Sequence, residues 1–116
     1  MYLSKEAIFA ADDRPTETVD VPEWGGKVIV KAISGTDRDR FEQSIANPKG
    51  GVKDGAVIRA RLVSLAVVDE KGQKIFEPRD MEELGKKSAA VLDRLYDVAA
   101  RISGISKAGQ EQAEKN

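Results

Sequence analysis

The 116-residue sequence contains no cysteine and no histidine. Without cysteine there is no disulfide framework and no thiolate nucleophile, as is typical of proteins from reducing compartments. Without histidine the chain lacks the commonest metal ligand and the commonest general base. These absences weigh against metal-dependent and nucleophilic enzymes, so we expect no metal ion and no cofactor.

A large net charge and long apolar runs are also lacking. The 19 Lys and Arg residues nearly balance the 20 Asp and Glu residues, for a formal net charge of -1. Such a chain has no global field to attract nucleic acid or acidic membranes. The longest clearly apolar run, Leu65–Val68, is far short of the ~20 residues that cross a bilayer. Met1–Ala11 lacks the apolar core of a signal peptide. We therefore expect neither a nucleic-acid nor a membrane partner.

What the sequence does contain is typical of one ordinary globular domain. Hydrophobic residues make up 41% and charged residues 34% of the chain, and this length supports a single modest core. We predict an α+β fold, with one helix-rich domain over residues 1–104 that contains two small β-hairpins. Residues 105–116 are small, polar and charged without periodicity, and we expect a flexible, disordered tail there.

Periodicity and turn residues place the expected elements along the chain. Two β-branched runs flank the turn at Pro22–Gly26 and predict a hairpin over 16–33, and a second alternation around Gly72 predicts another over 66–76. Capping residues and apolar spacing predict a short helical turn or an arm within 1–13, capped by Ser4. They also predict helices over 36–46, capped by Thr36, and over 56–65, 78–85 and 88–102. Residues 47–55, rich in glycine, predict a mobile loop.

The predicted helix over 88–102 has the clearest pattern. Its apolar residues form one stripe, and Asp97 and Arg101 are spaced for an i,i+4 ion pair. The stripe can belong to the protein's own core or to an interface, and the core is the more common use of such residues. The large side chains that we expect to stabilise the fold or an interface are Trp24, Phe41, Leu62, Leu95 and Ile102.

Three groups of polar residues are candidates for chemical sites. Ser88 follows Lys86 and Lys87, but serine is far more often a helix cap than the nucleophile of a Ser/Lys pair. Asp37, Asp39 and Glu42 could ligate a hard cation, and Asp39 and Glu42 share a helix face, yet acidic residues in a first turn also suit the helix dipole. The glycine and lysine neighbours at 25–27 and 49–51 lack the spacing of a phosphate loop. We predict no catalytic residue, no cofactor site and no metal site.

A set of segments in a fixed order carries a resemblance to a known family. The most distinctive is Val19–Val28, with Pro-Glu-Trp-Gly at its centre. The others are Ile33–Glu42, Arg59–Val63, Val67–Gly72, Leu84–Gly85 and Ala90–Leu95. Together they resemble the tail assembly chaperones of long-tailed, siphovirus-type bacteriophages and prophages. The similarity runs from about Thr16 to Gly104 and includes no catalytic motif.

The resemblance implies a non-catalytic chaperone in the host cell cytoplasm. Such a chaperone binds the tape measure protein, keeps it soluble, helps recruit the major tail protein, and is absent from the mature virion. The family also implies self-association and, commonly, a second product extended by ribosomal frameshifting. The alternative is a tail completion or connector protein that stays in the virion. A small-molecule or metal-dependent enzyme is a third interpretation, which the lack of histidine and cysteine disfavours.

Overall fold

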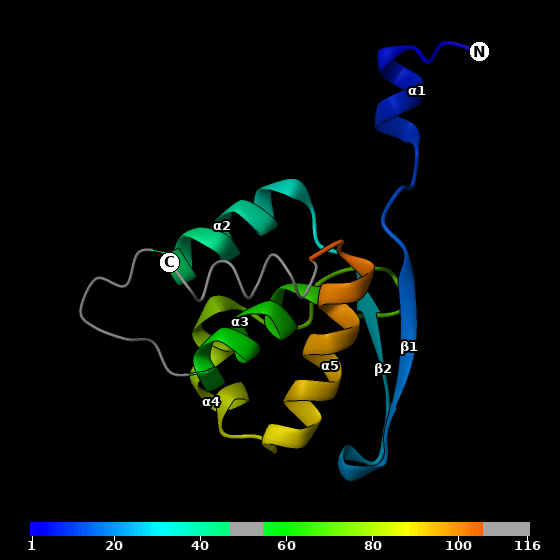
Figure 1. The fold of residues 1–116 in the computed structure, drawn as a ribbon. Coiled ribbons are helices and arrows are strands. Elements are labelled where there is room, and N and C mark those ends of the chain that lie inside the picture. The colour runs from blue at the N-terminus through cyan, green and yellow to red at the C-terminus, as the bar shows by residue number, and fades with distance from the viewer. Residues whose placement is uncertain (47–54, 106–116) are drawn as a thin grey trace.

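The computed structural model describes residues 1–46 and 55–105 (Figure 1). The predicted loop over 47–55 and the predicted tail lie outside these residues, except for Gly55 and Ile105. The elements are α1 (Lys5–Ala10), β1 (Thr16–Val21), η1 (Pro22–Trp24), β2 (Gly26–Lys31), α2 (Gly35–Ala46), α3 (Gly55–Ala66), β3 (Val67–Val68), η2 (Pro78–Asp80), α4 (Met81–Gly85) and α5 (Ala89–Ile102). The α+β class predicted from the sequence is confirmed.

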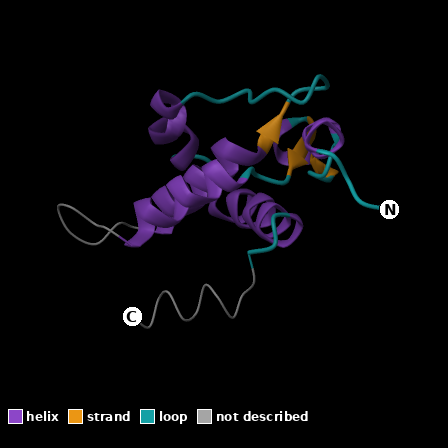
Figure 2. Ribbon diagram, turned by 90° about the horizontal axis from the view of Figure 1, so that it is seen from above, coloured by secondary structure: helices purple, strands orange, loops and turns teal. Residues whose placement is uncertain are grey.

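The strands form one antiparallel sheet in the order β1-β2-β3. The first predicted hairpin is confirmed, since β1 pairs with β2 from Thr16 opposite Lys31 to Val21 opposite Gly26. At its turn Gly25 has a φ of 80°, a conformation that glycine adopts at little cost. Figure 2 shows the strands grouped at one side of the long helices.

The second predicted hairpin is much shorter than expected. β3 has two residues, which pair with Ile29 and Val30 of β2, and the returning segment makes a single bridge between Lys74 and Val68. Its turn is as predicted, because Gly72 has a φ of 84°. The last backbone contact of the returning segment with β3 is the Ile75 amide, which donates to the Val67 carbonyl at 3.4 Å. Lys74 Nζ lies 2.7 Å from Asp37 Oδ2 on α2.

Serine side chains begin three of the helices. Ser4 Oγ accepts a hydrogen bond from the Ala7 amide at 3.1 Å, and Ser88 Oγ accepts one from the Val91 amide at 3.4 Å, so both predicted caps are confirmed. α2 begins one residue earlier than predicted, since the Asp37 amide donates to Ser34 Oγ at 3.2 Å. The N-cap of α2 is therefore Ser34, and the structure corrects the cap that we expected at Thr36.

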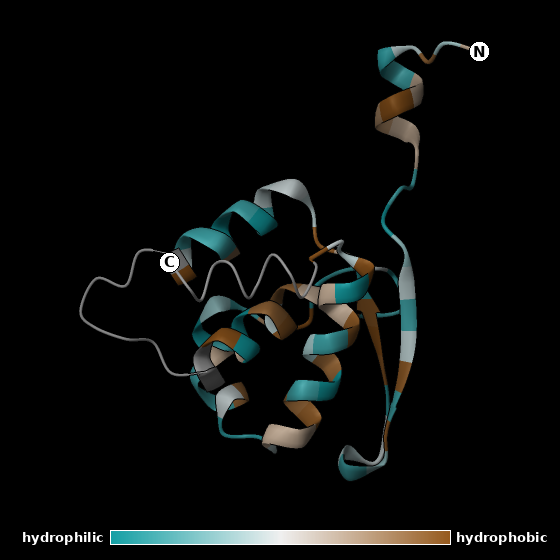
Figure 3. Ribbon diagram, viewed as in Figure 1, coloured by the Kyte–Doolittle hydropathy of each residue, from teal (hydrophilic) through white to brown (hydrophobic). Residues whose placement is uncertain are grey.

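The core lies between the sheet and the helices α2 to α5. In Figure 3 β2 is hydrophobic, and α5 alternates between hydrophobic and hydrophilic residues as an amphipathic helix does. α5 buries Val91, Leu92, Leu95, Ala99 and Ala100. The core continues through the end of α5, because Ile105 packs against it and its amide donates to the Ala100 carbonyl at 2.8 Å.

The helix α1 stands clear of this body. Figure 1 shows α1 beyond the end of β1, joined to it by a short extended segment. α1 has no buried residue. We call residues 1–10 the N-terminal arm.

Candidate functional site

The five residues expected to stabilise the fold or an interface fall into two groups. Phe41, Leu62 and Leu95 are buried in the core. Trp24 and Ile102 are half-buried and pack against that core. The apolar stripe of the last helix is therefore used mainly inside the protein, which leaves Trp24 and Ile102 as the members of this set with exposed surface.

An open cavity of about 430 Å³ lies beside Trp24. Its apolar wall is formed by Trp24 together with Ile75, Phe76 and Leu84, and its charged members are Asp80, Glu83 and Lys87. These residues come from η1, from the segment after β3, and from the η2–α4 region, so the fold gathers them from three parts of the sequence. We call this feature the Trp24 cavity.

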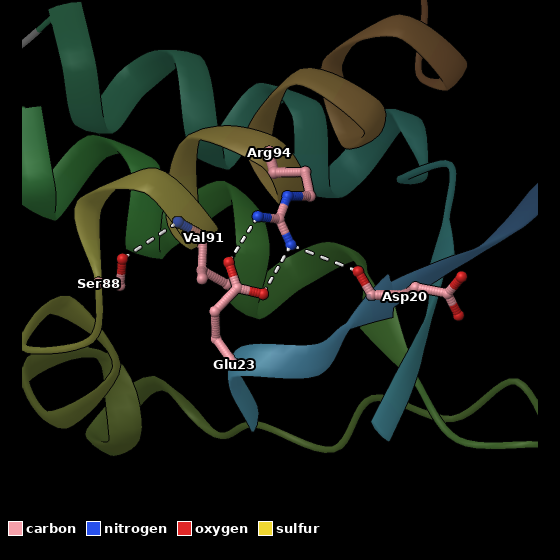
Figure 4. Close-up of polar contacts among 5 residues, drawn as sticks. All are labelled: Asp20, Glu23, Ser88, Val91 and Arg94. Atoms are coloured by element: carbon pink, nitrogen blue, oxygen red, sulfur yellow. Dashed lines mark hydrogen bonds and ion pairs between the residues drawn. The ribbon is translucent and has the colours of Figure 1, made fainter. Parts of the chain in front are cut away.

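A paired contact joins α5 to the β1–β2 turn at Glu23, the residue before Trp24 (Figure 4). Arg94 donates from Nη1 to Glu23 Oε1 at 3.1 Å and from Nη2 to Oε2 at 2.6 Å. Arg94 Nη1 also donates to the Asp20 carbonyl at 3.3 Å. The hydrogen bonds from Arg94 lower the pKa of Glu23 to about 2, and Glu23 in turn raises the pKa of Arg94.

A second arginine on α5 corrects a prediction. Arg101 Nη2 donates to both carboxylate oxygens of Glu17 on β1, each at 2.8 Å, rather than pairing with Asp97 as the spacing suggested. The contact with β1 is preferred because the face of α5 that carries Arg101 lies next to that strand. Arg94 and Arg101 thus fasten α5 to β1 at two points.

The polar groups that were weighed as chemical sites have structural partners. Asp37 is buried with its carboxylate next to Lys74, and Glu42 Oε1 accepts a hydrogen bond from Arg38 Nε at 2.9 Å. Ser88 acts as the cap of α5. Lys86 Nζ donates to Glu83 Oε1 at 3.2 Å. Asp37, Glu42, Lys86 and Ser88 therefore stabilise local structure. The segment 49–51 lies outside the described residues.

Within residues 1–46 and 55–105, no group of three or more acidic side chains is arranged to hold a metal ion. No helix in the same ranges has the length and apolar character needed to cross a membrane.

The N-terminal arm carries most of the large apolar side chains that the described structure leaves exposed. Among the described residues, the exposed large hydrophobic side chains are Met1, Tyr2, Leu3, Ile8, Phe9 and Ile75. All but Ile75 belong to the arm. The apolar character of Ile8 and Phe9 was visible in the sequence, but nothing there indicated that the body of the protein would leave them uncovered.

Comparison with known proteins identifies the family. The sequence model of the phage tail assembly chaperone family matches residues 4–116. The fold is similar to that of the bacteriophage HK97 tail assembly chaperone, with a TM-score of 0.64 and 22% identity over 84% of this chain and 94% of that one. None of the curated proteins compared with the chain matches it. The family consists of chaperones of tail assembly, a process that takes place in the host cell and a role that needs no catalysis. The chain belongs to the phage tail assembly chaperone family.

Proposed function

We propose that this chain binds the tape measure protein of its phage, keeps that long helical protein soluble, and helps bring major tail protein subunits to it. The observation that carries the proposal is the family match over residues 4–116. A chaperone of tail assembly must bind tail proteins, and the tape measure protein is the one with the greatest need of protection. A long helix without its final partners exposes an apolar stripe, and such stripes drive aggregation.

The charge of the chain suits this function. Many copies must lie side by side on one long client, and a formal net charge of -1 gives little repulsion between neighbouring copies. Binding must also be reversible, because the tail tube has to replace the chaperone. A small contact surface favours such reversibility, since weak and transient interfaces are smaller than permanent ones.

We assign client contact to side chains that keep exposed area on the folded body. Phe41, Leu62 and Leu95 are buried, so they support the helices without touching a client. Ile102 at the end of α5 is only partly buried and can contribute apolar area to a client helix. Trp24 keeps exposed area as well, at the edge of its cavity.

The test is co-expression of the chain with the tape measure protein of the same phage. We expect the tape measure protein to become soluble and to co-purify, and we expect Ile102→Asp to reduce the co-purified amount. Gln43→Asp adds the same charge at an exposed position of α2 and serves as the matched control. An insoluble tape measure protein in the presence of folded chaperone and of any frameshift-extended product would contradict the proposal.

We further propose that the chain leaves before the virion is complete. Mass spectrometry of purified virions then finds major tail protein and tape measure protein but not this chain. Its presence in fixed proportion to the tail would instead favour a completion or connector protein retained in the particle.

A further inference from the structure

The N-terminal arm concentrates the exposed apolar side chains of the described part of the chain. Tyr2 has a relative exposure of 102% and Phe9 of 79%, and no residue of α1 is buried. Single exposed apolar residues are normal on any surface, but a contiguous group of them marks an interaction site. The arm is therefore available to another molecule.

The area of the arm is small for a complete interface. The side chains of Tyr2 and Phe9 can each bury about 150–250 Å². A stable specific interface buries about 800 Å² on each partner, so the two aromatic residues supply only part of that area. A molecule that binds the arm therefore gains from a second apolar surface next to it.

The end of α5 lies next to the root of the arm. The Ala32 amide donates to the Pro15 carbonyl at 2.9 Å, which fixes the root. The Ile33 amide donates to Ser103 Oγ at 3.0 Å, which fixes the end of α5. Two consecutive residues thus hold both features, and Figure 1 shows α1 beyond this end of the body. Ile102, one residue before Ser103, is only partly buried and supplies the second surface.

The length of the linker suits an occupant as wide as a helix. Residues 11–15 join α1 to β1, and five residues of extended chain span at most roughly 17 Å. An α-helix with its side chains is about 10–12 Å across. The arm can therefore reach over a helix that lies against the end of α5 and cover its opposite side.

The charges of the arm do not suit a lipid surface. Helices that lie on membranes carry many Lys and Arg residues on their polar face. The six residues of α1 contain one of each sign, Lys5 and Glu6. A protein helix with an apolar stripe is therefore the better occupant.

A client chaperoned by many copies also suits the small area of each contact. Weak contacts along one long client add up, because each bound copy acts together with its neighbours on the same molecule. A single contact still breaks easily, so copies can leave one at a time when the tail tube replaces them. A large permanent interface would prevent such replacement.

We propose that the N-terminal arm clasps a helix of the tape measure protein against the end of α5. Phe9 and Tyr2 cover one side of that helix, and Ile102 contacts its other side. This inference rests on the proposed function and adds the segment of the chaperone that holds the client.

The first test is co-expression of full-length variants with the tape measure protein. Phe9→Asp should lower the amount of client recovered per copy of chaperone about tenfold, the factor that corresponds to one lost large apolar contact. Gln43→Asp adds the same charge at an exposed position of α2 and should recover as much client as the wild type. Circular dichroism should give one melting temperature for all three, since Phe9 lies outside the core.

The second test uses the absence of cysteine from the chain. A single cysteine introduced as Phe9→Cys or Ile102→Cys can carry a photoreactive cross-linker, and mass spectrometry then locates its target. We expect both positions to cross-link to the same helical segment of the tape measure protein. The matched control, Gln43→Cys, should not cross-link to that segment.

The outcomes separate this inference from the proposed function. A wild type that leaves the tape measure protein insoluble contradicts both. A wild type that recovers the client together with a Phe9→Asp variant that recovers as much overturns the arm's part alone. Cross-links from Phe9→Cys only to a second copy of the chaperone, or only to membrane lipid, would likewise overturn it, because the arm would then have a different occupant.

Discussion

Arg94 and Glu23 bind each other through two hydrogen bonds, although they lie 71 positions apart in the sequence. One contact at 3.1 Å and one at 2.6 Å give the fork geometry of a bidentate arginine–carboxylate pair. This geometry fixes the turn that carries Trp24 against α5. The wall of the Trp24 cavity therefore depends on a residue of the last helix.

The Arg94–Glu23 pair predicts a pH dependence of stability. The pKa of Glu23 is lowered from 4.5 to about 2 in the folded protein. A carboxyl group whose pKa is lower in the folded state than in the unfolded state stabilises the fold at pH values above its unfolded-state pKa. This stabilisation is lost as the pH falls toward the folded-state pKa. We expect Glu23→Gln to melt below the wild type at pH 7 and the difference to shrink between about pH 4.5 and pH 2. A difference that stays constant over this range would show that the pair does not supply it.

Leu95 and Ile102 on α5 predict unequal costs of truncation. Leu95 is buried, so Leu95→Ala should lower the free energy of unfolding by about 2–5 kcal/mol. Ile102 is half-buried, and Ile102→Ala should cost about 1–2 kcal/mol. Urea unfolding measures both changes in the free energy of unfolding. An m-value equal to that of the wild type would show that the substitution leaves the compactness of the folded and unfolded states unchanged. Equal costs would mean that Ile102 is as well packed as Leu95.

Trp24 is predicted to act in the cavity more than in the fold. Because its side chain is half-buried, we expect Trp24→Ala to remain folded and to lose about 1–3 kcal/mol of stability. Less tape measure protein should co-purify with the variant, since it lacks part of the exposed apolar area that we assign to client contact. A variant that keeps both the wild-type stability and the wild-type client binding would remove Trp24 from this account.

The composition of the last ten residues predicts that they add little to stability. The segment 107–116 is polar and charged, and such termini seldom contribute to a core. Thermal unfolding of a chain that ends at Ser106 should match that of the full chain. A loss above ~1 kcal/mol would show that the segment docks on the domain.

The elements that the sequence predicts well are those with local signals. The Ser88 cap and the apolar stripe determine α5, and Gly25 with the β-branched runs determines the first hairpin. The second hairpin is shorter than predicted, because its returning segment makes a single bridge to β3 while Lys74 pairs with Asp37 on α2. No local pattern contains that contact.

For the candidate residues, too, the sequence predicts what depends on nearby residues and not what depends on contacts between distant segments. Spacing showed that Phe41, Leu62, Leu95 and Ile102 lie on apolar faces, but it could not rank their burial, because burial depends on which neighbours cover each face. The predicted ion pair between Arg101 and Asp97 was wrong for a related reason, because it rested on their i,i+4 spacing alone. Its actual partner, Glu17, comes from a strand that only the fold brings close.

The contact between Arg94 and the Asp20 carbonyl has a consequence for concentrated solutions. Because the Pro15 carbonyl faces β2, the alternate residues Thr16, Thr18 and Asp20 direct their backbone groups to the open edge of the sheet. An open edge invites a strand from another molecule and is a common start of aggregation. Arg94 occupies one of these acceptors, while the bridge at Lys74 lies along β3 on the opposite side of the sheet. The open edge of β1 is thus partly blocked against pairing with a strand of another molecule, because one of its outward acceptors is already used within the protein.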